Sequence, residues 1–181
     1  LRITAIVIFC VLMFSFINGY FLARFKFKGS RGLSILYMSN LLVPIHAILV
    51  PVYIIFVKLG LSNHWYSTIL PCICMELTTS IFLVRSYVDT IPRELEEAAS
   101  IDGSSFTRTL LLIILPLIKP VVVTCGIISF FHVWNEFPFS LILFSNEKDY
   151  TLPLMLMRFK GEYFTDYPRV MTSLFVSIIP A

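Results

Sequence analysis

Charged residues are scarce in this sequence, and their scarcity indicates which class of protein it belongs to. Asp, Glu, Lys and Arg make up 14% of the 181 residues, whereas hydrophobic residues make up 57%. The mean hydropathy is +0.86. Soluble globular chains carry about 25% charged residues, so the composition predicts a membrane protein. The net charge of +3 gives no reason to expect nucleic-acid binding.

Recognisable catalytic and metal-binding patterns are also missing. The sequence contains neither HExxH nor GxSxG, which disfavours a membrane-embedded enzyme, and it lacks the GxxxxGKS/T phosphate loop. The 3 histidines show no metal-ligand spacing, and the 4 cysteines all lie in apolar runs. We expect the cysteines to act as small hydrophobic side chains. The sequence therefore predicts no catalytic residue, no metal site and no cofactor bound by this chain.

Long apolar runs fill most of the chain. A helix needs about 20 mainly apolar residues to cross the hydrocarbon core of a bilayer. Runs at 3–22, 33–57, 65–84 and 121–144 meet this length, and a fifth starts near Val170. The pattern predicts an all-α, polytopic membrane protein with four full spans and part of a fifth. Because both ends of the sequence fall inside apolar runs, we expect a fragment cut at both ends.

Basic residues at the span ends indicate the orientation. The loop ARFKFKGSRG, residues 23–32, holds four basic residues and no acidic one, so the positive-inside rule places it in the cytoplasm. Its Phe and basic residues are interpreted as a lipid-headgroup anchor rather than a nucleic-acid patch. Counting spans from this loop places residues 85–119 inside and residues 58–65 and 145–169 outside. Prolines within the spans predict kinked helices, which suit a transport path better than a passive anchor.

The segment PRELEEAASIDG, residues 92–103, interrupts the apolar pattern. Pro92 in a first turn followed by glutamates suits a helix N-terminus, and Gly103 suits the left-handed residue after a helix end. We expect a cytoplasmic helix of about three turns that docks into a partner's groove. A helix lying on the membrane surface is the alternative, which its acidity disfavours. The expected contact face comprises Leu95, Ala98 and Ala99, with Asp102 at its edge.

A longer pattern begins within this helix. Residues 97–99 (EAA) are followed after three residues by Gly103, and after nine more by Ile113 and then residues 115–116 (LP). This pattern matches every fixed position of the EAA signature of the permease subunits of bacterial binding-protein-dependent ABC importers, and the sequence resembles that family. The segments ARFKFKG, LPLIKP, WNEFPF and YTLPLML are similar to its carbohydrate branch, the maltose and oligosaccharide type. The resemblance covers essentially the whole chain.

The resemblance implies the ABC importer transmembrane-domain fold, in one permease domain over residues 1–181. It implies half of a translocation pathway for a sugar or oligosaccharide, with the EAA region, within residues 85–119, as a coupling helix that docks into a cytoplasmic ATPase. The residues expected at that contact are Glu97, Ala98, Ala99, Asp102 and Gly103. Four residues are expected to pack the coupling helix and its surroundings. Leu95 lies on the contact face of that helix, and Ile113, Leu115 and Pro116 are packing and kink positions in the helix that follows.

The resemblance also implies partners. They are a cytoplasmic ABC ATPase dimer that carries ATP and Mg, a second permease subunit that is favoured to be a different chain, an extracytoplasmic solute-binding protein, and the lipid of a bacterial cytoplasmic membrane; no nucleic acid is expected. A permease for a non-sugar solute, such as a polyamine, phosphate or an amino acid, is the alternative. A stand-alone secondary carrier is a weaker alternative, because it would need no coupling helix.

Polar residues within the spans are candidates for the substrate path, because polar groups are costly at membrane depth. These are Asn40, Glu76, Thr79, Asn135 and Glu136. Glu76 and its neighbouring hydroxyls could line a path for sugar or water, or form hydrogen bonds between helices. At residues 135–136, just before Pro138, a helix break near the outer side is favoured over a sugar contact. Trp134 and Phe137 are interpreted as interfacial belt residues rather than sugar-stacking rings.

Overall fold

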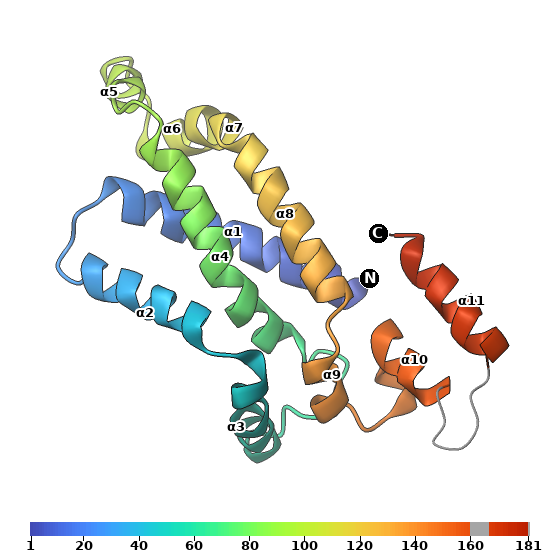
Figure 1. The fold of residues 1–181 in the computed structure, drawn as a ribbon. Coiled ribbons are helices and arrows are strands. Elements are labelled where there is room, and N and C mark those ends of the chain that lie inside the picture. Colours follow the sequence, from blue (N-terminus) through green and yellow to red (C-terminus); the bar gives the residue numbers. More distant parts are fainter. Residues whose placement is uncertain (160–166, 181) are drawn as a thin grey trace. The chain divides into compact units, whose positions relative to one another are not determined.

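The computed structural model describes residues 1–159 and 167–180, and this part of the chain folds into helices joined by turns and loops (Figure 1). The prediction of an all-α protein is confirmed. The chain divides into two compact units. Unit 1 combines Leu1–Val7, Val43–Cys72 and the chain from Phe130 onward, and unit 2 combines Ile8–Leu42 and Ile73–Ser129.

Among residues 1–159 and 167–180, two helices are by themselves long and apolar enough to cross a membrane. They are α1 (Arg2–Arg24) and α4 (Ile69–Asp89). Two further candidate spans are broken pairs: α2 (Ser30–Leu42) with α3 (Ile45–Lys58), and Phe106–Leu117 with α8 (Lys119–Trp134), the second pair bent by 71°. The predicted number of four spans therefore holds only if each broken pair crosses once.

The second predicted span, residues 33–57, is broken into two helices, as its prolines suggest. Pro44 stands between α2 and α3 with extended backbone angles, φ −68° and ψ 135°. Proline lacks the N–H that a helix needs, and it disfavours helical angles in the residue before it. Pro51, by contrast, lies inside α3.

The helices at the third and fourth predicted spans begin or end at other residues than predicted. The third begins at Ile69 rather than Trp65, because backbone turns such as Ser67 N–H to the His64 carbonyl occupy the preceding residues. The fourth is not one helix over residues 121–144. It ends at Trp134, and a separate helix α9 (Pro138–Leu143) follows after a break.

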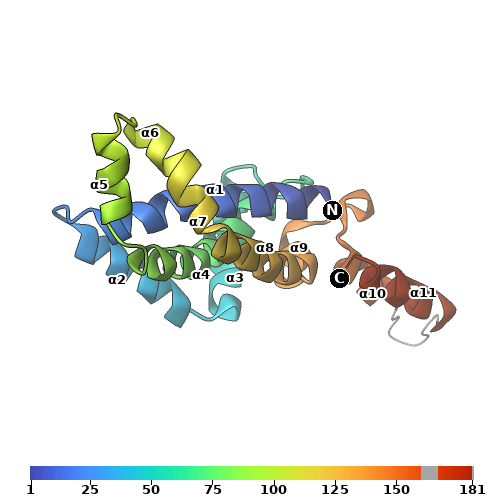
Figure 2. The same ribbon diagram turned by 90° about the horizontal axis from the view of Figure 1, so that it is seen from above.

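The core of unit 2 joins α1, α4 and the helices that lead into α8. Its buried residues are Phe16, Tyr20, Val84, Val88, Ile91, Ile114, Ile118, Val121 and Cys125. Helices α1 and α4 approach closely at Gly19, where an added Cβ atom would lie 2.7 Å from the Val84 Cγ1 atom. Beyond this core, α5 (Glu94–Ile101) and α6 (Phe106–Thr109) project from unit 2, as Figure 2 shows from above.

Unit 1 joins two loops that the orientation rule places outside. The backbone N–H of Asn63 donates to the Leu143 carbonyl at 2.7 Å, and the Asn63 side-chain oxygen accepts from the N–H groups of Ser145 and Asn146. These hydrogen bonds join Asn63 to residues 143–146, and the side of the membrane on which they lie stays a prediction. A 3-10 turn, Glu147–Asp149, leads to α10 (Leu152–Phe159), and α11 (Tyr167–Ile178) follows.

Candidate functional site

Helix α5 is shorter and starts later than the sequence predicts. It begins at Glu94 with Arg93 at the N-cap position, so the prediction of Pro92 in its first turn is wrong. Its 8 residues make about two turns rather than three. The Thr90 hydroxyl donates to the Tyr87 carbonyl at 2.7 Å, just beyond the end of α4.

The end of α5 is closed by a left-handed glycine, as predicted. Gly103 has φ +77°. Its N–H donates to the Ser100 carbonyl at 3.1 Å, and the Ser104 N–H donates to the Ala99 carbonyl at 2.9 Å, the two hydrogen bonds of a Schellman motif. A Cβ atom at Gly103 would meet nothing within 4 Å in the described part of the chain. Glycine is therefore required here by the backbone angle and not by crowding.

One glutamate ties α5 to the end of α1. The Glu96 carboxylate accepts hydrogen bonds from the Arg24 guanidinium at 2.6 Å and from the Tyr20 hydroxyl at 2.6 Å. Arg24 also donates to the Ile91 carbonyl at 2.9 Å. The side chains of the ion pair are only 7% and 20% exposed for Arg24 and Glu96. These contacts hold a helix too short to be stable alone in a fixed position.

Sequence patterns alone do not identify these tethering residues. Glu96 was one of three glutamates in a short acidic run, and Arg24 was counted only as a basic residue of a cytoplasmic loop. Glu96 lies 72 residues after Arg24 and 76 residues after Tyr20, its two hydrogen-bond donors. Their opposite charges were the available signal, but nothing in the local pattern singles out this pair.

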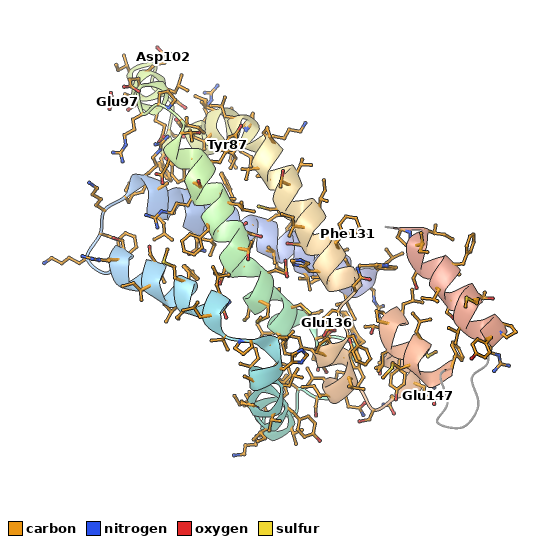
Figure 3. The ribbon with its side chains drawn as sticks, viewed as in Figure 1. Tyr87, Glu97, Asp102, Phe131, Glu136 and Glu147 are labelled. Carbon is orange, nitrogen blue, oxygen red and sulfur yellow. The ribbon has the colours of Figure 1, made fainter. Side chains whose placement is uncertain are left out.

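The predicted contact surface of α5 is mostly accessible. Glu97, Ala98, Asp102 and Gly103 are exposed, and Figure 3 labels Glu97 and Asp102 on the projecting helix. Leu95 is also exposed. Ala99 is only 6% exposed, because it lies three residues after Glu96, on the side that the tether turns toward its own chain.

One apolar residue of this surface was missed. Ile101 is 86% exposed and follows Ala98 by three residues and Leu95 by six, so the three side chains form one stripe of α5. We call Leu95, Ala98 and Ile101 the exposed stripe. An isoleucine near the end of the acidic helix was the signal that could have identified it.

The kink predicted after α5 is present. Residues Leu110–Ile114 form a π-helix, in which the Leu115 N–H donates to the Leu110 carbonyl five residues back. Pro116 follows and cannot donate a backbone hydrogen bond. The chain then bends by 71° before α8. π-helical turns and prolines are recognised causes of helix bending.

The packing roles predicted for this segment are only partly matched. Ile113 and Leu115 are half-buried, and Pro116 is exposed. The fully buried positions are instead Ile114 and Ile118, which enter the core of unit 2. Leu115 packs against this core without being fully buried.

Aromatic rings connect α6 to the end of α1. Phe106 lies with its ring centroid 6.0–6.2 Å from those of Tyr20, Phe21 and Phe25. Tyr20 therefore belongs both to this cluster and to the Glu96 tether. A displacement of the α5–α6 projection would act directly on α1.

The polar residues of unit 2 make contacts between helices. The Asn40 side-chain amide in α2 donates to the Thr78 hydroxyl in α4 at 2.9 Å and to the Cys74 carbonyl at 3.3 Å. Glu76 and Thr79, on the same stretch of α4, are half-buried. Asn40 therefore joins two helices, and its role as a path residue stays a prediction, as do those of Glu76 and Thr79.

The helix break predicted at residues 135–136 is present in unit 1. The Glu136 carboxylate accepts from the Phe139 N–H at 2.5 Å, the Ser140 N–H at 3.3 Å and the Ser140 hydroxyl at 2.6 Å. It satisfies the free N–H groups at the start of α9 and places negative charge at the positive end of that helix. The Asn135 side chain instead donates to the Phe131 carbonyl of its own helix at 2.8 Å. Figure 3 shows Glu136 at the junction of α8 and α9.

Comparison with protein families gives a match over nearly the whole chain. The family model described as "Binding-protein-dependent transport system inner membrane component" matches residues 15–180. This range contains the EAA pattern, the exposed stripe and the broken pair that leads into α8.

Named relatives extend this match. The chain is 36% identical over 178 residues to the probable ABC transporter permease protein YurM of Bacillus subtilis, covering 98% of this chain and 59% of that protein. It is 33% identical over 169 residues to the sulfoquinovosyl glycerol transport system permease protein SmoH of Agrobacterium fabrum (93% and 59%). It is 32% identical over 182 residues to the multiple sugar-binding transport system permease protein MsmG of Streptococcus mutans (98% and 65%). The chain thus spans less than two thirds of the length of these relatives.

A solved structure has the same fold. It is the crystal structure of a bacterial ABC transporter involved in the import of the acidic polysaccharide alginate, and one of its chains matches with a TM-score of 0.82. The match covers 98% of this chain and 67% of that chain at 21% sequence identity. The predicted ABC importer transmembrane-domain fold is therefore confirmed.

Proposed function

Since this chain belongs to the family of inner membrane components of binding-protein-dependent transport systems, we propose that it forms half of the translocation pathway of an ATP-driven importer for a sugar or oligosaccharide. In this proposal α5 docks into a cleft of a separate cytoplasmic ATPase. Movements of the ATPase then reach the spans through the contacts that α5 and α6 make with α1 and α8.

The observation that carries this proposal is the construction of α5. The helix projects from unit 2, presents the exposed stripe, and is held to α1 by the Arg24–Glu96 pair and the Tyr20 hydroxyl. A force applied to the exposed side of α5 is therefore transmitted to a membrane-spanning helix through charge-assisted hydrogen bonds, which are roughly twice as strong as neutral ones. A helix that only rested on the membrane surface would need no such tether.

Sugar is the proposed solute because of the relatives. Several carry names of sugar transport systems, among them the arabinooligosaccharides transport system permease protein AraQ of Halalkalibacterium halodurans and the melibiose/raffinose/stachyose import permease protein MelC of Bacillus subtilis. The family resemblance of the segments YTLPLML and WNEFPF points to the same branch.

The proposal includes partners. ATP and Mg would bind to the ATPase dimer, since the sequence lacks a phosphate loop. A second permease subunit, favoured to be a different chain, would complete the pathway, and an extracytoplasmic solute-binding protein would deliver the sugar. The complex would lie in the bacterial cytoplasmic membrane.

Reconstitution tests the proposal. The full-length chain, its partner permease and its ATPase are placed in proteoliposomes with the binding protein and a panel of labelled sugars, amino acids, polyamines and phosphate. We expect accumulation of at least one sugar that requires both ATP and the binding protein. Accumulation of a non-sugar solute alone, or sugar uptake that is independent of ATP, would overturn the proposal.

A further inference from the structure

A pocket in unit 2 lies between the helices α1, α2 and α4 and takes no part in the proposed coupling. Its volume is about 390 Å³. The wall is built from the end of α1, the first part of α2 and the last part of α4, all within unit 2. The wall residues that matter here are Leu22, Arg31, Ser34, Ile35, Met38 and Arg85.

Hydrogen bonds hold the three helices around this pocket. The Arg85 guanidinium in α4 donates to the Ser34 hydroxyl in α2 at 3.0 Å. Farther along α2, the Tyr37 hydroxyl donates to the Asn18 side-chain oxygen in α1 at 3.3 Å, and Asn40 donates to α4. The space between the helices is therefore fixed by contacts of α2 with both α1 and α4.

The charge of the wall is positive. Arg31 and Arg85 line the pocket, and none of the described residues that line it is acidic. The Asp89 carboxylate lies 3.9 Å from the Arg85 Nε atom, too far for a hydrogen bond, and its side chain is 52% exposed. Two like charges in one small wall repel each other, so the pocket favours a bound anion.

The two arginines have donors left for a ligand and can be reached from outside. A guanidinium carries five N–H donors. Within residues 1–159 and 167–180, Arg85 uses one of them, toward Ser34, and Arg31 makes no hydrogen bond. The Arg85 side chain is 33% exposed, and Arg31 is exposed. Because the guanidinium fork matches the oxygens of a phosphate, these donors suit a phosphate group.

Apolar side chains continue the pocket away from the arginines. Arg31, Ile35 and Met38 follow one another by four and three residues, so they lie on one face of α2. The rise of an α-helix places Met38 about 10 Å from Arg31 along the axis. Ile35 and Met38 are 58% and 55% exposed, and Leu22 of α1 belongs to the same wall. The wall thus has a cationic end and an apolar end, as an anionic amphiphile requires.

The pocket lies where lipid headgroups are expected. The candidate span α1 ends at Arg24, and α2, which contains Arg31, begins the next candidate span. The loop between them carries Lys26 and Lys28 and is predicted to be cytoplasmic. Basic pockets between transmembrane helices on that side suit anionic lipid headgroups. A free anion would use the arginines but would leave the apolar end uncovered.

From these features we propose that the pocket binds one anionic phospholipid. Its phosphate lies between Arg31 and Arg85, and the start of one acyl chain packs on Leu22, Ile35 and Met38. The bound lipid joins α2, which has no buried residue, to α1 and α4. The inference goes beyond the proposed function and holds for any transported solute.

The test measures binding of phosphatidylglycerol to the purified full-length transporter in detergent by native mass spectrometry, with phosphatidylcholine as the zwitterionic control lipid. Arg31→Gln and Arg85→Gln each remove one charge from the wall. The matched control is Lys28→Gln, since Lys28 is an exposed cation of the adjoining loop and lies outside the wall. Titrations at raised ionic strength suppress the diffuse attraction between the loop and anionic lipid.

We expect the wild type to retain one phosphatidylglycerol per copy of this chain and to bind phosphatidylcholine more weakly. Arg31→Gln or Arg85→Gln should weaken phosphatidylglycerol binding at least about tenfold, the effect of one lost hydrogen bond to a charged group. Lys28→Gln should weaken it by less than about fivefold, the effect of one basic residue near a lipid surface.

Two further measurements separate lipid binding from loss of structure and from binding of a free anion. Because Arg31 is exposed, Arg31→Gln without lipid should melt at the wild-type temperature, and it should lose the stabilisation that phosphatidylglycerol gives to the wild type. Inorganic phosphate should stabilise the wild type much less than phosphatidylglycerol does, since it makes no contact with the apolar end.

Three results would overturn the lipid site. Equal weakening by Lys28→Gln and Arg31→Gln would show a diffuse attraction instead of a site. Stabilisation by inorganic phosphate as large as that by phosphatidylglycerol would show a free-anion site. A wild-type complex that retains no phosphatidylglycerol would show that a protein segment covers the pocket. The proposed function would stand in all three cases, because it is tested separately by sugar uptake.

Discussion

Arg24, the last residue of α1, and Glu96, in the first turn of α5, form an ion pair at 2.6 Å although they are separated by 72 residues. The Tyr20 hydroxyl shares the same carboxylate. This relationship turns a short helix, unstable alone, into a rigid extension of a membrane-spanning helix. It also gives two neighbouring glutamates of α5 different surroundings. Glu96 binds residues of its own chain, whereas Glu97 is exposed.

Removal of the Glu96 carboxylate should uncouple the transporter. Glu96→Ala leaves the Arg24 guanidinium without its partner, and breaking a buried ion pair costs on the order of 3 kcal/mol. We expect sugar uptake to fall at least tenfold while the protein is still inserted in the membrane. Glu97→Ala is the control for tether stability, since Glu97 is exposed. The readouts are uptake in proteoliposomes and hydrogen exchange of α5, and unchanged exchange protection in Glu96→Ala would contradict the tether.

Substitutions at Gly103 should follow the preference for left-handed backbone angles. A left-handed conformation costs most L-residues about 1–2 kcal/mol, and Asn tolerates it better than Val. Because a Cβ atom meets nothing within 4 Å among the described residues, Gly103→Asn should keep more uptake than Gly103→Val. Equal and complete loss in both variants would indicate that the partner needs the space above Gly103 instead.

Two helical glycines should respond to alanine in opposite ways. In Gly19→Ala the new Cβ would lie 2.7 Å from Val84 Cγ1 and 3.1 Å from the Arg85 backbone nitrogen. Overpacking of this kind costs about 1–3 kcal/mol. In Gly126→Ala the nearest atom, Leu12 Cδ1, is 3.7 Å away, so the gain in helix propensity of up to about 1 kcal/mol should remain. Thermal unfolding of the two purified variants checks this difference, and a lower melting temperature for Gly126→Ala than for Gly19→Ala would refute it.

Glu136 should matter for the start of α9. Glu136→Ala removes the acceptor for the Phe139 and Ser140 N–H groups, and loss of such a cap costs about 0.5–2 kcal/mol. Faster amide exchange in residues 139–143 is the expected result. Glu136→Gln keeps an acceptor oxygen and should lie between the alanine variant and wild type. A Glu136→Ala variant with unchanged exchange would show that α9 does not depend on this carboxylate.

The sequence predicts the class of fold and the C-terminal end of α5 well, because these depend on local signals. Apolar runs locate the spans, and Gly103 marks the end of α5. The EAA spacing leads to the family. The kinks near Pro116 and before Pro138 follow from residue types with known backbone effects.

What the sequence does not predict depends on contacts between distant segments. The choice of Glu96 rather than Glu97 as the tether requires knowledge of where Arg24 lies. Prolines within the spans predict kinks, but the sequence does not tell which proline breaks a helix: Pro44 separates α2 from α3, whereas Pro51 lies inside α3. The π-helix at Leu110–Ile114 also has no local sequence signal.

The central claim, that α5 is the contact with the ATPase, is tested most directly by site-specific photo-crosslinking in the full-length complex. A photoreactive residue is placed at Ile101, on the exposed stripe, and in a control variant at Tyr53, an exposed residue of α3 in unit 1. The account predicts a crosslink to the ATPase subunit from position 101 and none from position 53. If position 101 forms no crosslink to the ATPase subunit in a complex that still transports sugar, the claim is contradicted.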